Sequence, residues 1–209
     1  PAEEDLLVSI LSNRMAGLEY RDFDVRLVED SGSKFIEITH AAFEDVNFIE
    51  DYISGKGELV FRELLPEVEW DEERIPEYFG DLSYWREIDL GSEHVLGVMP
   101  KGSDVQLYFD PEGQELFREV ISNNVGRPLG VYLDDAVSPI AIPVVDPSLV
   151  ESEEAANPVI QGGLDERSAE LLALQINGGT LPVDLVPEDR SFTEPGMNLS
   201  LIYNVLTIS

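Results

Sequence analysis

The residues that could do chemistry in this chain are few, and their spacing favours structural roles. Asp134 and Asp135 could serve as paired catalytic carboxylates, but adjacent side chains on a tight turn point apart, so we predict a turn between two apolar strands. His40 and His94 lie at the ends of expected strands, and neither has the neighbouring ligands of a metal site. We therefore predict no catalytic residue, no metal site and no enzyme activity.

Two glycine pairs and two tryptophans are the other candidates for ligand binding. The pairs Gly162-Gly163 and Gly178-Gly179 flank an expected helix, but they lack the spacing of a phosphate-binding loop, and helix termination accounts for them. Trp70 and Trp85, with neighbouring tyrosines, could line a groove for a peptide or a sugar, or could pack in a core or an interface. The chain has no cysteine, which excludes thiolate chemistry. We predict no cofactor.

The strongest global feature is the charge. Among 209 residues, 43 are Asp or Glu and 13 are Lys or Arg, so the formal net charge is -30. Such a chain repels phosphate backbones and anionic lipids, and we expect neither a nucleic-acid partner nor binding to a membrane surface through a basic patch. The 43% of hydrophobic residues favours a globular fold rather than disorder.

The low lysine content indicates that the protein works at high salt concentration. Only three lysines stand against the 43 acidic residues, a balance that suits strong brine, where salt screens the repulsion between carboxylates. We therefore expect a salt-loving archaeal source. An acidic partner-binding face or calcium binding is the alternative, although no EF-hand loop is found.

The elements that position these residues alternate between helix and strand. Residues 3–16 and 44–53 have helical spacing of apolar positions, residues 22–29 and 34–39 predict a hairpin, and residues 57–65 predict a strand. Residues 66–91 are acidic and aromatic without a clean period, so we expect an irregular connector with one short helix near residues 75–79. This order is typical of an α+β fold.

A second unit of similar build follows the connector. Residues 93–99 and 104–109 predict strands, and Asp110 and Pro111 begin a helix that ends before Gly126. A second hairpin is expected from residues 129–133 and 137–145, then a short strand at residues 158–161 and a helix from Asp165 to Gly178. The tail suits edge strands that return to the first unit. The longest apolar stretches fall short of the roughly 20 residues of a membrane helix.

Four motifs, taken in order, resemble the large extracytoplasmic domain of SecD, a membrane subunit of the protein-export machinery. The likeness covers residues 6–186. Its most specific element is a helix that runs into a small-residue turn and Leu-Pro. The motifs are Ile10 to Leu18, Gly57 to Arg62, Gly130 to Pro139, and Val159 to Gly163 with Leu171 to Val183.

The resemblance implies a ferredoxin-like base subdomain interrupted by an α+β head subdomain. We expect the base at residues 1–65 and again at 181–209, and the inserted head at residues 66–180, with residues 66–91 as the connector. It also implies that the domain lies on the extracytoplasmic side of the cell membrane, attached through transmembrane helices absent from this chain. The implied partners are SecF, the Sec translocon channel and a translocating preprotein, which the domain would contact while ion flow drives head movement.

The two expected crossings between base and head are candidate hinges, because proline restricts the backbone on one side and glycine frees it on the other. The hinge residues predicted are Leu65, Pro66, Gly179, Thr180, Leu181 and Pro182. The alternative is that these proline and glycine residues only form ordinary loops.

Two other functions fit the same residues. A secreted or cell-surface binding module of a halophile would use the Trp70 to Trp85 region as a ligand groove. An extracellular hydrolase would need a nucleophile, a metal set or a separated pair of acids, and none is evident in the sequence.

Overall fold

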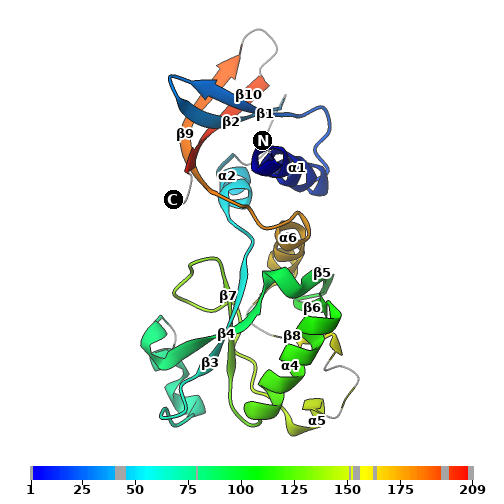
Figure 1. Cartoon of the computed structure of the whole chain (residues 1–209), viewed down its shortest axis with the longest axis vertical. Coiled ribbons are helices and arrows are strands. Elements are labelled where there is room, and N and C mark those ends of the chain that lie inside the picture. Colours follow the sequence, from blue (N-terminus) through cyan, green and yellow to red (C-terminus); the bar gives the residue numbers. More distant parts are fainter. Residues whose placement is uncertain are drawn as a thin grey trace. The chain divides into compact units, whose positions relative to one another are not determined.

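The chain forms two compact units, and the second is inserted in the first (Figure 1). This computed structural model describes residues 2–40, 46–78, 80–150, 152, 156–161, 164–193 and 198–206. Unit 1 consists of Pro1–Gly57 and Gly178–Ser209, and unit 2 consists of Glu58–Asn177. The chain therefore passes between the units twice, at the bonds Gly57–Glu58 and Asn177–Gly178.

Unit 1 is a four-stranded antiparallel sheet with two helices on one face (Figure 1). The strand order is β1-β2-β10-β9. The elements are α1 (Ala2–Gly17), β1 (Asp24–Asp30), β2 (Ser33–His40), α2 (Val46–Ser54), β9 (Asp184–Thr193) and β10 (Asn198–Leu206). The first two residues of the predicted helix 44–53 lie outside the described residues.

Alternation along the central strands builds the core of unit 1. Ile36 and Ile38 of β2 are fully buried, and in the register of β10 they lie opposite Tyr203 and Leu201, which are also buried. Because successive side chains of a strand point to opposite faces, these four share the face that the helices cover. The tail thus pairs with β2 of the first unit.

Unit 2 contains two three-stranded antiparallel sheets and two long helices. One sheet has the order β4-β3-β7 and the other β5-β6-β8. The strands are β3 (Leu59–Leu64), β4 (Trp85–Gly91), β5 (Val95–Lys101), β6 (Asp104–Phe109), β7 (Leu129–Leu133) and β8 (Val159–Ile160). The helices are α3 (Ile75–Tyr78), α4 (Pro111–Asn123), α5 (Pro147–Val150) and α6 (Glu166–Asn177), with short 3-10 turns at 72–74, 82–84 and 92–94.

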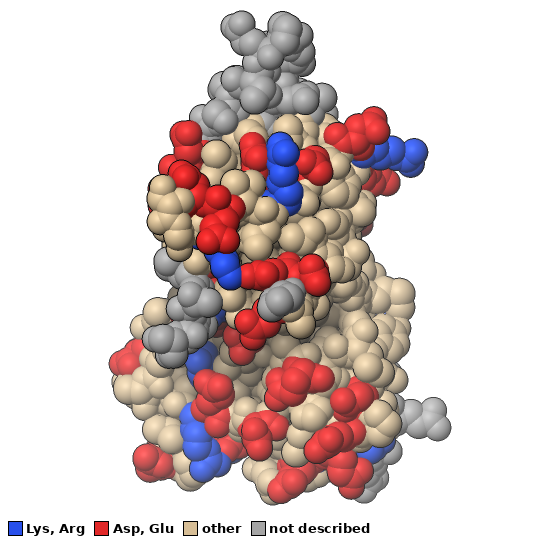
Figure 2. Space-filling view, turned by 45° about the horizontal axis from the view of Figure 1, so that its top comes forward, with Lys and Arg blue, Asp and Glu red and all other residues tan. Residues whose placement is uncertain are grey.

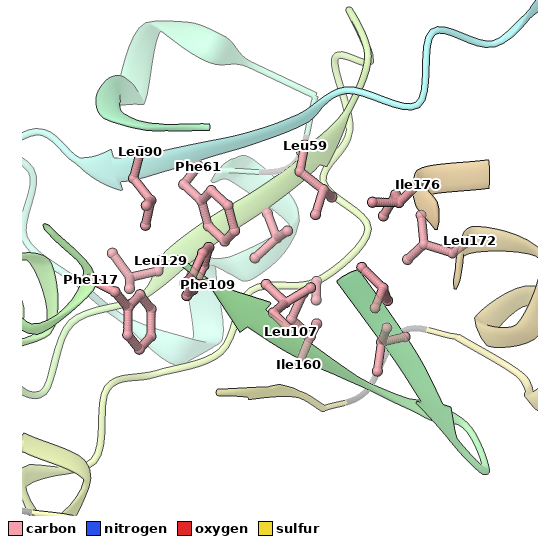
Figure 3. Packing of buried hydrophobic residues seen from close by; sticks show 14 of the residues in the cluster. Leu59, Phe61, Leu90, Leu107, Phe109, Phe117, Leu129, Ile160, Leu172 and Ile176 are labelled. Carbon is pink, nitrogen blue, oxygen red and sulfur yellow. The ribbon is translucent and has the colours of Figure 1, made fainter. Parts of the chain in front are cut away.

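The main core of unit 2 joins both sheets to α4 and α6 (Figure 3). Phe61 of β3, Phe109 of β6 and Phe117 of α4 lie in ring contact, with centroids 6.1 and 5.6 Å apart. Leu172 and Ile176 of α6 close the core beside the second sheet. Helix α4 begins as predicted, since the Asp110 carboxylate accepts a bond from the amide of Gly113 at 2.6 Å.

A second, smaller core lies on the other face of the β4-β3-β7 sheet. Leu64, Tyr78 and Trp85 are buried in it, and the Trp85 indole donates to the carbonyl of Tyr78 at 3.0 Å. Leu64 points away from the face that carries Leu59 and Phe61, because strand side chains alternate. Residues 66–78 and 80–84 therefore fold back over this face, and Trp70, Tyr78, Tyr84 and Trp85 pack there instead of lining a ligand groove.

The α+β fold class is confirmed, and three local predictions need correction. Residues 85–91 form strand β4, where an irregular connector was expected, because a β-bulge in its pairing with β3 breaks the simple alternation. Residues 137–145 do not form a strand and make only isolated bridges at Ala141 and Val144, since Pro139 and Pro143 cannot donate to a ladder. Residues 58–65 belong to unit 2, where β3 pairs with β4 and β7.

Acidic side chains are spread over the surface of the described elements. Figure 2 shows them scattered across the visible face, with few Lys and Arg among them. Among the described helices, none is long and apolar enough to cross a membrane.

Candidate functional site

The first predicted hinge does not lie at a crossing. Leu65 and Pro66 follow β3 inside unit 2, where the amide of Leu65 donates to the carbonyl of Tyr84 at 2.9 Å. The Arg127 guanidinium donates to the carbonyls of Leu64 and Leu65 at 3.1 and 2.9 Å. The chain changes unit eight residues earlier, at Gly57, because the partners of β3 belong to unit 2.

The second predicted hinge directly follows a crossing. Residues 179–182 come just after the bond Asn177–Gly178, at the start of the second part of unit 1. Gly179 has a φ of 104° and lies against Ile10, whose Cγ1 would be 3.1 Å from an added Cβ. The hinge role of Gly179, Thr180, Leu181 and Pro182 stays a prediction.

Arg14 of α1 binds the backbone on the unit 1 side of both crossings. Its side chain is fully buried, and Nη1 donates to the carbonyls of Tyr52, Ile53 and Gly55 at the end of α2. Nη2 donates to the carbonyl of Lys56 at 2.8 Å and to that of Gly179 at 2.9 Å. One guanidinium therefore satisfies carbonyls that a helix C-terminus leaves without partners and joins two segments far apart in sequence.

Unit 2 holds its own ends of the crossings by separate bonds. The Asp134 carboxylate accepts from the amide of Glu58, and the amide of Asp134 donates to the carbonyl of Glu58, both at 2.8 Å. The side-chain amide of Asn177, the last residue of α6, accepts from the amide of Val98 at 2.8 Å and donates to its carbonyl at 2.7 Å. Asp134 is one of the two turn residues predicted from sequence, and its φ is 55°. Through its bonds to Glu58, this turn holds the first residue of unit 2.

An open groove lies along β8 in unit 2. Strand β8 pairs with β6 on one side and forms the edge of its sheet on the other. The groove has a volume of about 540 Å³, and its walls include Val144, Leu149, Pro158 and Val159. These four residues also line a small apolar cavity of about 60 Å³ that reaches Phe61 and Phe117 of the core.

Opposite charges flank the apolar part of the groove. Lys101 lies in one wall and Asp146 in another. Hydrogen bonds from the hydroxyl and amide of Ser148 hold the pKa of Asp146 below its usual range, so this carboxylate stays ionised at neutral pH. An edge strand with an apolar slot and separated charges can accept an extended polypeptide through backbone pairing and side-chain insertion.

The remaining candidates from the sequence have structural surroundings. His94 lies 3.3 Å from the carboxylate of Asp110 at the start of α4, and His40 lies 2.9 Å from the carbonyl of Arg21. The pair Gly162-Gly163 lies outside the described residues. Among the residues that the structure describes, no group of three or more metal-binding side chains is found.

Sequence reasoning missed Arg14 and the β8 groove. Arg14 occupies an apolar-face position of the first predicted helix, and a lone arginine in such a stripe is the signal that could have marked it. The groove depends on which strand lies at the sheet edge, and no local pattern carries that information.

Solved structures match the fold over most of the chain. A structure of a membrane component SecDF that enhances protein export aligns over 88% of this chain and 90% of its own, with 17% identity and a TM-score of 0.65. A crystal structure of SecDF in a super-membrane-facing form aligns over 88% of this chain and 27% of its own, with 20% identity and a TM-score of 0.67.

Sequence comparisons agree with the structural match. The model of the SecDF P1 head subdomain matches residues 96–183. A protein translocase subunit SecD from Petrotoga mobilis is 23% identical over 97% of this chain and 49% of its own length. Another, from Acidaminococcus fermentans, is 34% identical over 42% of this chain and 20% of its own length. The chain is therefore similar to SecD proteins in sequence and to SecDF in fold.

The matched P1 head segment contains some of the candidate sites and not others. The P1 head segment begins in β5, includes β6, α4, β7, β8 and α6, and continues past the second crossing to Val183. The β8 groove therefore lies inside it, apart from Phe61 at the base of the apolar cavity. Arg14 and the first crossing precede it. The chain spans about half the length, or less, of the curated SecD relatives it matches.

Proposed function

We propose that this chain is the extracytoplasmic domain of a SecD subunit that works with SecF beside the Sec translocon channel. In this proposal it assists Sec-dependent translocation by contacting the emerging preprotein. Unit 1 is the base, unit 2 is the head, and ion flow through membrane helices outside this chain moves the head. The similarity to SecD proteins supports the proposal at the level of the subunit.

The observation that carries the preprotein contact is the open groove beside β8. A preprotein crosses the membrane as an extended chain, and a recognition site for many such chains must use what they share. Backbone groups and occasional apolar side chains are common to all of them. The edge of β8 that pairs with no described strand, together with the apolar cavity, can bind both. Among the described residues that line the groove, Lys101 and Asp146 carry the charges, and one charge of each sign imposes little sequence preference.

The movement is supported by the double crossing. Because unit 2 is a continuous insertion, two covalent connections link it to unit 1, and two connections restrict motion more than one linker does. Hinge closure about a few residues is a common form of domain motion. Such motion would displace a bound polypeptide without changes inside either unit.

Site-specific photo-cross-linking in the membrane-embedded subunit tests the contact. A photo-reactive amino acid placed at Val144, which is 41% exposed in the groove, is expected to cross-link to an export-arrested preprotein. The matched control is the same substitution at Val186, which is 43% exposed and lies in unit 1. Equal cross-linking at both positions, or none at Val144 while export proceeds, would refute the proposed contact.

A further inference from the structure

The two crossings are fixed on both sides by hydrogen bonds that each remain within one unit. On the unit 1 side, Arg14 binds Gly55, Lys56 and Gly179, and the amide of Leu181 donates to the carbonyl of Lys56 at 2.9 Å. These bonds join the two connections to one another before either leaves unit 1.

On the unit 2 side, the clamps begin at the first residue of the unit. Glu58 is bound through both backbone groups to Asp134, and the amide of Leu59 donates to the hydroxyl of Ser92. Asn177 is bound through its side chain to both backbone groups of Val98. Both ends of unit 2 are therefore tied to the body of that unit.

One glycine remains between the clamps in each connection. Gly57 lies between Lys56 and Glu58, and Gly178 lies between Asn177 and Gly179. Gly57 has a φ of 75°, which glycine adopts without strain, and its carbonyl has a 3.5 Å contact with the Thr180 hydroxyl, at the outer limit of a hydrogen bond. Glycine has the widest choice of backbone conformations, so a change of φ and ψ causes the least backbone strain at these two positions.

We propose that Arg14, Asp134 and Asn177 are positioning residues that confine bending between the units to a pair of single-residue joints, Gly57 and Gly178. Two joints define an axis, so the units move about one direction and resist others. In this proposal the first hinge lies at Gly57 and not at Leu65 and Pro66. The second lies at Gly178, the residue directly before the predicted segment 179–182. This inference rests on the proposed movement of the two units and does not depend on what the groove binds.

Distance measurements by pulsed electron spin resonance on the 209-residue chain test the proposal. The chain has no cysteine, so introduced pairs are labelled uniquely. The pair Asp30→Cys and Glu115→Cys reports between the units, and the pair Asp30→Cys and Asp51→Cys reports within unit 1. Arg14→Lys keeps the charge but cannot reach the same carbonyls, and we expect a distance distribution between units about twofold wider than in the parent.

Arg127→Lys is the matched control. Arg127 also binds consecutive carbonyls, those of Leu64 and Leu65, but within unit 2 and away from both crossings. We expect no widening between units in this variant. Equal widening in both variants, or none in Arg14→Lys, would overturn the proposal.

If Arg14→Lys unfolds unit 1, the distance distribution of the pair within unit 1 will widen. A second variant then tests the proposal. Asp134→Ala removes the carboxylate that accepts from the Glu58 amide, one of the two bonds that hold Glu58 on the other side of the joint. We expect it to widen the distribution between units while the pair within unit 1 keeps its width. If the distribution between units does not widen in this variant, the proposal of two single-residue joints is wrong. The cross-linking at Val144 would still test the preprotein contact independently.

Discussion

At the scale of single residues, the buried phenol of Tyr132 has an unusual environment. The side chain is fully buried, its hydroxyl has no hydrogen-bond partner in the described part of the chain, and the Arg62 guanidinium lies 4.5 Å from the ring centre. Burial raises the pKa of Tyr132 to about 12, and the positive charge of Arg62 offsets this only in part. Burial likewise raises the pKa of Tyr52 to about 12.

These raised pKa values give the stability a defined pH dependence. An unfolded tyrosine has a pKa of about 10, so the folded state favours the protonated phenol. The resulting stabilisation is fully present below about pH 10 and is lost as the pH rises toward the folded value of about 12. The free energy of unfolding should therefore fall across this interval.

Replacing Tyr132 with phenylalanine should remove part of this alkaline loss. At pH 7 we expect Tyr132→Phe to change the free energy of unfolding by less than about 1 kcal/mol, because the lost hydroxyl has no partner among the described residues. At pH 11 the variant should be more stable than the parent. Urea unfolding at both pH values measures this, with Tyr84→Phe as the control. A loss of several kcal/mol at pH 7 would mean that the hydroxyl is bound.

At the scale of elements, the β4-β3-β7 sheet depends on a close approach at Gly130. This residue lies opposite Arg62 in the register of β3 and β7, on the face of the smaller core. A Cβ at Gly130 would lie 2.6 Å from Cε2 of Tyr132 and 3.2 Å from Cζ3 of Trp85. The tryptophan can pack against the sheet only because position 130 has no side chain.

Gly130→Ala should therefore destabilise unit 2. We expect a loss of about 2 kcal/mol in the free energy of unfolding, since overpacking in a core forces rings and backbone to shift. The tryptophan fluorescence should change as Trp85 moves. Gly97→Ala is the control, because its Cβ would meet only ordinary contact, 3.5 Å from Asn177. If both variants unfold at the same urea concentration as the parent, the packing argument is wrong.

The elements also separate what sequence can predict from what it cannot. Helix α4 was predictable because Asp110 and Pro111 act locally on the helix start. Strand β4 was missed because its bulge changes which residues face each core. The crossing at Gly57 depends on β3 pairing with β7, some seventy residues later, so the local stop at Leu65-Pro66 misplaced it. The role of Arg14 could not be predicted from sequence, because it depends on where the chain crosses between the units.

At the scale of the whole molecule, the net charge of -30 is the dominant electrostatic feature. Acidic side chains lie across the visible face with few basic neighbours, so they repel one another in the folded state more than in the expanded chain (Figure 2). The Debye length is about 10 Å at 0.1 M salt and about 3 Å at 1 M, and salt therefore weakens this repulsion strongly.

Stability should consequently rise with salt concentration. We expect the urea midpoint, followed by far-UV circular dichroism, to increase between 0.1 M and 2 M NaCl. In the triple variant Asp71→Asn, Glu72→Gln and Glu73→Gln the increase should be smaller, because three exposed negative charges are removed from one segment of unit 2. Replacing three neutral exposed residues, Asn13, Ser33 and Asn123, with alanine should leave the salt dependence as in the parent. A midpoint that is equally high in dilute buffer would contradict the view that the charge adapts the domain to brine.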